Sequence, residues 1–307
     1  MDRVVKFLAY DGKASIICVD TKELVEKIRN IHDLTPTTTA IMGRFATVCG
    51  IMGFTSIKEN DDSLTIQIKG DGPAGVIVGI VKREDKISKI KSYIQNPLVE
   101  LPLKDNGKID VGGAVGNSGY LNVIKQSNIT EREYNGLVPL VSGEIAEDFT
   151  QYFATSEQKP TVLALGVLVN KDGVAQAGGY IINLMPDATE EVIVNIEKAL
   201  KDIPNITTML AEGKTLEEIA KIVTGDENVQ IIENDLKIEF ECDCNKEKFE
   251  KGLISIGKDD LNKIIEEDGK ADVVCHFCNK NYHFDKKELT NLLNQIYIFK
   301  KKGDNKR

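Results

Sequence analysis

Four of the six cysteines in this 307-residue sequence lie in its last quarter, where their spacing predicts metal chemistry. They form two close pairs, Cys242-Asp243-Cys244 and Cys275-His276-Phe277-Cys278, which are thirty residues apart. A zinc ion takes four soft ligands in a tetrahedron, about 2.3 Å from each sulfur, and two short-spaced pairs on separate turns supply that geometry. The pattern therefore predicts one zinc ion per chain, bound by Cys242, Cys244, Cys275 and Cys278.

The same four thiols are candidates for redox chemistry. In an extended chain Cys242 and Cys244 lie on one face, but a disulfide between them requires the backbone to bend. Strained disulfides have more oxidising potentials and tend to be regulatory, whereas Cys275 and Cys278 pair more easily. Oxidation to sulfenic acid and then to disulfide would remove the metal ligands. Residues 236–296 make a small module, and metal binding of about 10 to 16 kcal/mol is coupled to folding in comparable modules, so we expect oxidation to unfold it.

Two other interpretations of the cysteines stay open at this point. A constitutive structural zinc site, such as a nucleic-acid-binding zinc ribbon, also uses four cysteines, although the formal charge of -9 opposes binding to phosphate. A thiol-disulfide oxidoreductase also uses Cys-x-x-Cys, normally at the start of a helix in a thioredoxin-like unit. Val273 and Val274, just before Cys275, instead favour a strand followed by a knuckle.

The remaining candidates for chemistry are interpreted as structural. His276 and His283 are expected at the surface or beside the metal ligands, because four thiolates already complete the coordination. Cys18 lies in an apolar segment and Cys49 among small residues, so both are predicted to be core residues. His32 is predicted to be a solvated surface residue near a helix end.

Acidic and glycine-rich segments offer no clear catalytic group. Glu144, Glu147 and Asp148 are explained by the dipole of a helix that begins near them. Residues 112–119 lack the Lys-Ser/Thr of a phosphate-binding loop, and a hairpin turn is predicted there. With no nucleophile and base in evidence, we predict no enzymatic activity and no cofactor besides zinc.

Hydrophobic periodicity predicts how the chain supports these cysteines. The first part is expected to mix strands and helices. Strands are predicted at residues 3–9, 14–19, 63–69, 75–81, 161–170 and 174–184, and helices at 21–31, 36–57 and from Ser142 to near Gln158.

From residue 187 the apolar spacing changes to that of helices. Val192, Ile196 and Leu200 share one helix face, and Thr215 with Glu218 forms a capping box for a helix that extends to Val223. We therefore expect an α+β protein with a mixed α/β core domain at residues 1–180, a helical linker at 181–235 and a small C-terminal zinc-binding redox-switch domain at 236–307.

The length of 307 residues favours two or three folded units in one chain. Hydrophobic residues make up 41% and charged residues 28%, which is ordinary for a soluble globular protein. The apolar run 162–169 is far shorter than the roughly 20 residues of a membrane span. The start of the sequence lacks the apolar stretch of a secretory signal, so a cytoplasmic location is expected.

Several motifs together resemble those of a known family. They are Cys242-Asp243-Cys244-Asn245 and residues 274–284, preceded by residues 67–73, 142–148, 152–153, 156–158 and 177–180. With these motifs, which extend over nearly the whole chain, the sequence resembles the redox-regulated holdase chaperones of the heat shock protein 33 family.

The resemblance implies a function that the residues alone do not show. It implies a dormant state that is reduced and zinc-bound, and an oxidised state that binds unfolding client proteins without ATP. It further implies that Cys275 and Cys278 form the first disulfide, with release of zinc. Cys242 and Cys244 then form the second disulfide as the linker unfolds, and the active species is a homodimer. Neither nucleic acid nor a membrane is expected as a partner.

Overall fold

The computed structural model describes residues 2–60, 62–127 and 132–304. The chain divides into two compact units, Met1–Glu241 and Cys242–Arg307. Within the described ranges, no helix is both long and apolar enough to cross a membrane.

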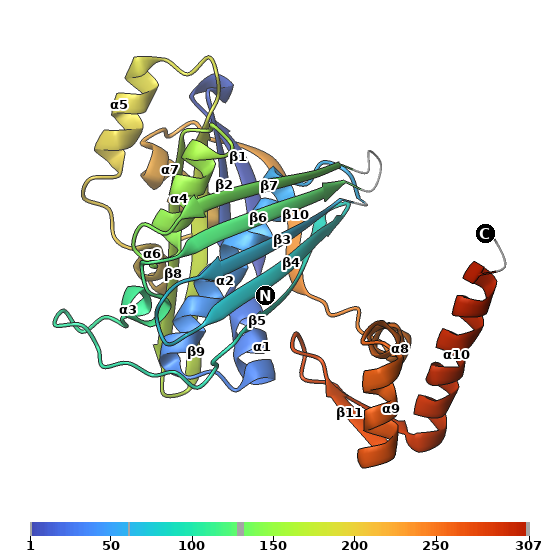
Figure 1. Cartoon of the computed structure of the whole chain (residues 1–307). Helices are drawn as coiled ribbons and strands as arrows, with labels where there is room; N and C mark the ends of the chain where they lie inside the picture. Colours follow the sequence, from blue (N-terminus) through green and yellow to red (C-terminus); the bar gives the residue numbers. More distant parts are fainter. Residues whose placement is uncertain (1, 61, 128–131, 305–307) are drawn as a thin grey trace. The chain divides into compact units, whose positions relative to one another are not determined.

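The first unit is built on a ten-stranded sheet, shown in blue to orange in Figure 1. Neighbouring strands are antiparallel except β5 and β10, which pair in parallel. In spatial order the strands are β7 (Arg132–Pro139), β6 (Tyr120–Ser127), β3 (Ser63–Lys69), β4 (Val76–Glu84), β5 (Ile87–Ile94), β10 (Gln230–Phe240), β1 (Arg3–Ala9), β2 (Ala14–Asp20), β9 (Gly173–Leu184) and β8 (Thr161–Asn170). The parallel pair thus joins two antiparallel halves.

Helices lie on both faces of this sheet. They are α1 (Lys22–His32), α2 (Pro36–Thr55), α3 (Val111–Val115), α4 (Ala146–Thr155), α5 (Glu190–Ala199), α6 (Ile206–Ala211) and α7 (Leu216–Thr224), with a short 3-10 turn, η1 (Tyr10–Gly12), between β1 and β2.

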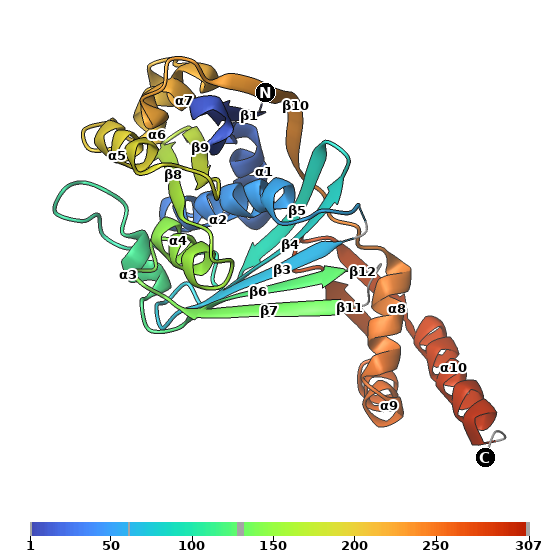
Figure 2. The same ribbon diagram turned by 90° about the horizontal axis from the view of Figure 1, so that it is seen from above.

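Helix α2 is the centre of the first unit. It begins at Pro36, and the hydroxyl of Thr35 accepts a hydrogen bond from the N–H of Thr38. It contacts β4 and β5 in one half of the sheet and β8 and β9 in the other, and Figure 2 shows it lying between them. Its small residues permit this close packing, since a Cβ added to Gly53 would lie 2.0 Å from the Ser88 hydroxyl oxygen.

Helices α5, α6 and α7 pack against the sheet through a second apolar cluster. Strands β1, β2 and β9 supply Phe7, Ile16 and Tyr180, all buried. The helices supply the residues that cover them: Val192, Ile196, Ile206, Met209, Leu210, Leu216, Ile219, Ala220 and Val223. Each of these helices is short, so packing rather than intrinsic propensity holds them in place.

The second unit is a small module of three helices and one hairpin. Its elements are α8 (Lys246–Ser255), α9 (Lys258–Glu267), β11 (Lys270–Val274), β12 (Asn281–Asp285) and α10 (Lys286–Asp304). Its buried apolar core consists of Leu253, Leu261, Ile265, Phe284, Leu289 and Leu292.

Most predicted elements of the first unit are present, but strands β5, β6 and β7 were not predicted. Strand β10 was not predicted; it spans the expected boundary at residue 235 and pairs with β1 and β5. The hairpin turn predicted at residues 112–119 is wrong, because residues 111–115 form α3, which ends before Gly116 at φ 82°. The mixed α/β fold is confirmed, and the division into three domains stays a prediction.

Candidate metal centre

The second cysteine pair lies in the turn between β11 and β12. The Cys275 N–H donates to the Lys280 carbonyl at 2.9 Å, and the Cys275 carbonyl accepts from the N–H of Asn279 at 2.8 Å. Asn279 has a φ of 57°, a left-handed conformation that asparagine tolerates. The predicted strand and knuckle are therefore confirmed, and Cys-x-x-Cys does not begin a helix as it would in a thioredoxin-like unit.

The first cysteine pair lies in the extended segment just before α8. Asn245 caps that helix, since its side chain accepts from the N–H of Lys248 at 2.9 Å. The Lys248 ammonium donates in turn to the Asp243 carbonyl at 2.8 Å and to its carboxylate at 2.6 Å. These contacts fix the residue between the two thiols, so that both sulfurs face the knuckle.

The structure brings all four predicted cysteines together. Their sulfur atoms all lie within 4.8 Å of one another. Cys242 and Cys275 are 3.8 Å apart and Cys244 and Cys278 are 3.3 Å apart, measured between sulfurs. A tetrahedron with bonds of about 2.3 Å has edges of about 3.8 Å, so this cluster fits a zinc ion with small adjustments. Clustering is thus observed, while the role of the cysteines as zinc ligands stays a prediction.

The thiols have unequal acidities. Burial raises the pKa of Cys242 and of Cys278. Burial acts the same way on Cys244, but hydrogen bonds from Tyr282 and the other thiols outweigh it and lower the pKa of Cys244 to about 7. The hydrogen bond to Cys244 in turn raises the pKa of Tyr282 to about 12. The surroundings of Cys244 therefore stabilise its thiolate form, whereas those of Cys242 and Cys278 do not.

Tyr282 is a site residue to which the sequence assigned no role. Its hydroxyl oxygen lies 3.2 Å from the Cys244 sulfur and donates to the Cys244 carbonyl at 3.0 Å. Its ring packs against Phe249 of α8, with 4.7 Å between ring centroids and 35° between ring planes. Residue type and spacing give no signal for this contact, and in the sequence Tyr282 stands out only as part of a motif.

The other candidate thiols and histidines fall outside the cluster, which contains neither His276 nor His283. His283 instead pairs with Asp272, at 2.8 Å between Nδ1 and the carboxylate. Cys18 and Cys49 are fully buried, as predicted, and burial raises the pKa of both thiols.

The surface position predicted for His32 is wrong. Its side chain is buried, and Nε2 lies 3.0 Å from the Ser92 carbonyl oxygen, within hydrogen-bond distance. Ser92 lies on β5, sixty positions away in the chain, so the local sequence did not reveal this partner.

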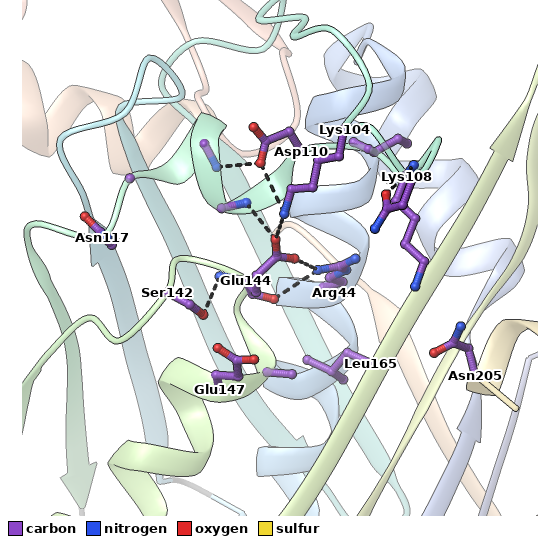
Figure 3. A pocket seen from close by; sticks show the side chains of 16 residues that line it. Arg44, Lys104, Lys108, Asp110, Asn117, Ser142, Glu144, Glu147, Leu165 and Asn205 are labelled. Carbon is purple, nitrogen blue, oxygen red and sulfur yellow. Dashed lines mark hydrogen bonds and ion pairs between the residues drawn. The ribbon is translucent and has the colours of Figure 1, made fainter. Parts of the chain in front are cut away.

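A polar pocket of the first unit is lined by Glu144 and Glu147, which lie near the start of α4 (Figure 3). Glu144 precedes the helix rather than lying in its first turns, and Figure 3 shows Arg44 and Lys104 pointing at its carboxylate. The two cations lie 2.6 Å and 2.5 Å from it. Burial opposes ionisation, but these ion pairs outweigh it and lower the pKa of Glu144. Glu144 therefore has a structural explanation, although not the helix dipole that was predicted.

Known proteins resemble this chain along nearly all of its length. A family model described as "Hsp33 protein" matches residues 2–285. A protein named "33 kDa chaperonin" from Clostridioides difficile (strain 630) is 44% identical over 295 residues, which cover 96% of this chain and 99% of the relative. Its namesake from Enterococcus faecalis (strain ATCC 700802 / V583) is 42% identical over 292 residues, covering 95% and 96%. The crystal structure of a 33 kDa chaperonin (heat shock protein 33 homolog) from Thermotoga maritima matches with a TM-score of 0.84 and 34% identity, covering 95% of this chain and 98% of the other.

Proposed function

This chain belongs to the Hsp33 family of chaperones, and on that premise we propose that it is a redox-regulated, ATP-independent holdase. In this proposal the reduced, zinc-bound protein is dormant. Oxidation of the cysteine cluster activates it to bind unfolding proteins and to prevent their aggregation. The observation that supports the proposal is the gathering of four thiol sulfurs within 4.8 Å in a module with a small core.

The four cysteines are assigned as the ligands of one zinc ion, which would hold their thiolates together and neutralise part of their charge. Among the described side chains of the module, six apolar residues are buried in its core, and domains of this size often need a metal to remain folded. Loss of the ligands should therefore unfold it.

The activating step is a two-electron oxidation by a peroxide. A thiolate of Cys275 or Cys278 attacks one peroxide oxygen; the S–O bond forms, the O–O bond breaks and hydroxide leaves. The second thiolate attacks the sulfenic sulfur, the S–S bond forms and the former peroxide oxygen leaves as hydroxide. The two sulfurs have then lost two electrons and the peroxide has gained them. A second peroxide would oxidise Cys242 and Cys244 in the same way.

The pairing Cys275–Cys278 and Cys242–Cys244 is supported by the family resemblance. The distances in the cluster also allow the cross pairs Cys242–Cys275 and Cys244–Cys278, at 3.8 Å and 3.3 Å between sulfurs. Peptide mapping of the oxidised protein separates the two patterns.

The linker would transmit the unfolding of the module to a client-binding surface. We assign residues 1–180 to the core domain, 181–235 to the linker and 236–307 to the redox-switch domain. Helices α5 to α7 bury their apolar faces on β1, β2 and β9, so their release would expose apolar surface on both sides of that contact. Large exposed apolar patches are typical of protein-binding sites, which favours unfolded or partly folded proteins as partners.

Four further properties belong to the proposal. The active species is a homodimer, and the protein is not an enzyme and does not bind nucleic acid. A cytoplasmic location suits a thiol switch, because that compartment keeps thiols reduced until stress oxidises them.

The test follows zinc release and client aggregation in one experiment. Zinc-loaded, reduced protein is treated with hydrogen peroxide at raised temperature, while a metal indicator reports free zinc and light scattering reports aggregation of a heat-unfolded client. We expect aggregation to fall as zinc is released. Full release of zinc with unchanged client aggregation would contradict the holdase assignment and favour a constitutive structural zinc site, for which zinc-dependent nucleic-acid binding at varied salt is the direct check.

A further inference from the structure

One of the four clustered sulfurs has a side-chain hydroxyl beside it. Tyr282 lies on β12, and its hydroxyl oxygen is 3.2 Å from the sulfur of Cys244. Cys242 and Cys278 instead receive backbone N–H groups, from Cys244 and Lys280. The environments of the two cysteine pairs are therefore unequal, and the tyrosine acts on the Cys-x-Cys pair.

Three contacts hold the hydroxyl in place. The backbone of Tyr282 is paired with Val273 in the β11–β12 hairpin, and its ring packs against Phe249 at 4.7 Å between centroids. The hydroxyl also donates to the Cys244 carbonyl at 3.0 Å. Because these contacts already fix the Tyr282 side chain, the side chain loses little further entropy when its hydroxyl binds Cys244.

A hydroxyl in this position changes the reactivity of a thiolate. A thiolate has no proton to donate, so a hydrogen bond between the pair must come from the tyrosine, whose one proton is then shared between the Cys244 sulfur and the Cys244 carbonyl. Hydrogen bonds to an ionised partner are the stronger ones. A hydrogen bond to the sulfur withdraws electron density from it and covers one side of it, so the sulfur attacks an oxidant more slowly. The same hydrogen bond also fixes the direction in which a metal ligand points.

We propose that the Tyr282 hydroxyl positions Cys244 and shields its sulfur from peroxide, so that Cys244 is oxidised after Cys275 and Cys278. This inference rests on the proposed function and adds a residue that sets the order of oxidation. The delayed step is attack of the Cys244 thiolate on a peroxide oxygen, with formation of S–O, cleavage of O–O and departure of hydroxide. Tyr282 is a positioning residue here and is itself neither oxidised nor deprotonated.

The test compares Tyr282→Phe, which removes only the hydroxyl, with the wild type as full-length, zinc-loaded proteins. Asp272→Asn is the matched control, because it removes the exposed pair with His283 from the same hairpin and leaves the sulfurs untouched. Peroxide is added, samples are quenched with an alkylating reagent, and mass spectrometry follows each cysteine over time. A metal indicator follows zinc in parallel, and chelator competition measures zinc affinity before oxidation.

We expect the oxidation rate of Cys244 to rise about tenfold in Tyr282→Phe, so that Cys244 reacts together with Cys275 and Cys278, while Asp272→Asn behaves as wild type. An unchanged order and rate in Tyr282→Phe would overturn the inference, and so would an equal change in the control. Loss of zinc from Tyr282→Phe before any peroxide is added would also overturn it, because the hydroxyl would then serve metal affinity alone. If the wild type itself fails to couple zinc release to client binding, the proposed function fails instead.

Discussion

The phenolic hydroxyl of Tyr10 donates a hydrogen bond to the backbone carbonyl of Thr224, with 2.7 Å between the oxygens. Tyr10 begins η1 between β1 and β2, and Thr224 is the last residue of α7. The backbone N–H of Tyr10 also donates to the Asp226 carboxylate at 2.7 Å. Both bonds connect the turn of the β1–β2 hairpin to the C-terminal end of α7. The unfolding of the proposed linker would have to break them.

Tyr10→Phe should loosen α7 without unfolding the sheet. The variant keeps the ring but removes the donor to Thr224, and one such bond contributes about 1 kcal/mol, or about a fivefold change in a local opening equilibrium. We expect amide hydrogen exchange in residues 216–224 to become about five times faster, while β1 and β2 stay protected. Tyr134→Phe, at an exposed tyrosine, is the control. Equal exchange in α7 of Tyr10→Phe and wild type would show that the bond does not secure the helix.

Asp148→Asn should destabilise the first unit. The Asp148 carboxylate is fully buried and accepts N–H bonds from Val141 at 2.7 Å and Ile145 at 2.9 Å. These bonds hold Ile145 at φ 72° and ψ -57°, a conformation that a β-branched residue rarely adopts.

An asparagine keeps one of the two oxygens and turns an NH₂ group toward a backbone donor. We expect a loss of about 2 kcal/mol in the free energy of unfolding, measured by urea denaturation followed by circular dichroism. Glu147→Gln, next in the chain and exposed, should change it by less than about 0.5 kcal/mol. A loss in the control as large as in Asp148→Asn would mean that the buried network is not the cause.

The four clustered cysteines could be predicted from the sequence, whereas the side chain that contacts them could not, and the difference has a physical reason. Ligand type and local spacing almost suffice for a zinc site, so the amino-acid sequence alone assigns Cys242, Cys244, Cys275 and Cys278 to one cluster. The role of Tyr282 comes from its contact with Cys244, 38 positions away in the chain, and local sequence patterns do not reveal such a contact.

The errors in the fold have the same origin. His32 was placed at the surface because its partner, the Ser92 carbonyl, lies on a distant strand. Strand β10 did carry a local signal, since Leu236, Ile238 and Phe240 alternate and are buried, but its first half is largely exposed. Its parallel pairing with β5 is a long-range contact, which the spacing of hydrophobic residues along the sequence cannot specify.

Glu144→Gln should change the pH dependence of stability. The lowered pKa of Glu144 means that the folded protein holds this carboxylate ionised more strongly than the unfolded chain does. Its contribution is thus fully present above the ordinary pKa of 4.5 and is lost as the pH falls through the lower, folded-state value.

We therefore expect Glu144→Gln to be less stable than wild type at pH 7, with the difference shrinking below about pH 4.5. Urea denaturation at a series of pH values measures it, and Glu197→Gln on the exposed face of α5 is the control. A difference that stays constant down to pH 3 would show that lost packing, rather than ionisation, explains the variant.

Removal of zinc from the reduced protein should unfold the second unit and leave the sheet of the first unit folded. The core of the second unit contains six buried apolar residues among the side chains that the structure describes, whereas the first unit has a ten-stranded sheet packed around α2. Domains as small as the second unit often need a metal to stay folded, and the metal-free thiolates would repel one another.

After treatment with a zinc chelator we expect backbone amides of β11 and β12 to lose their protection from hydrogen exchange, while those of β1 and β2 keep it. Added zinc should restore protection, and added magnesium should not, because magnesium prefers oxygen ligands. Protected amides in β12 after complete removal of the metal would show that the module folds by its apolar core alone. Oxidation could then not open it through loss of zinc, because the fold would not depend on the ion.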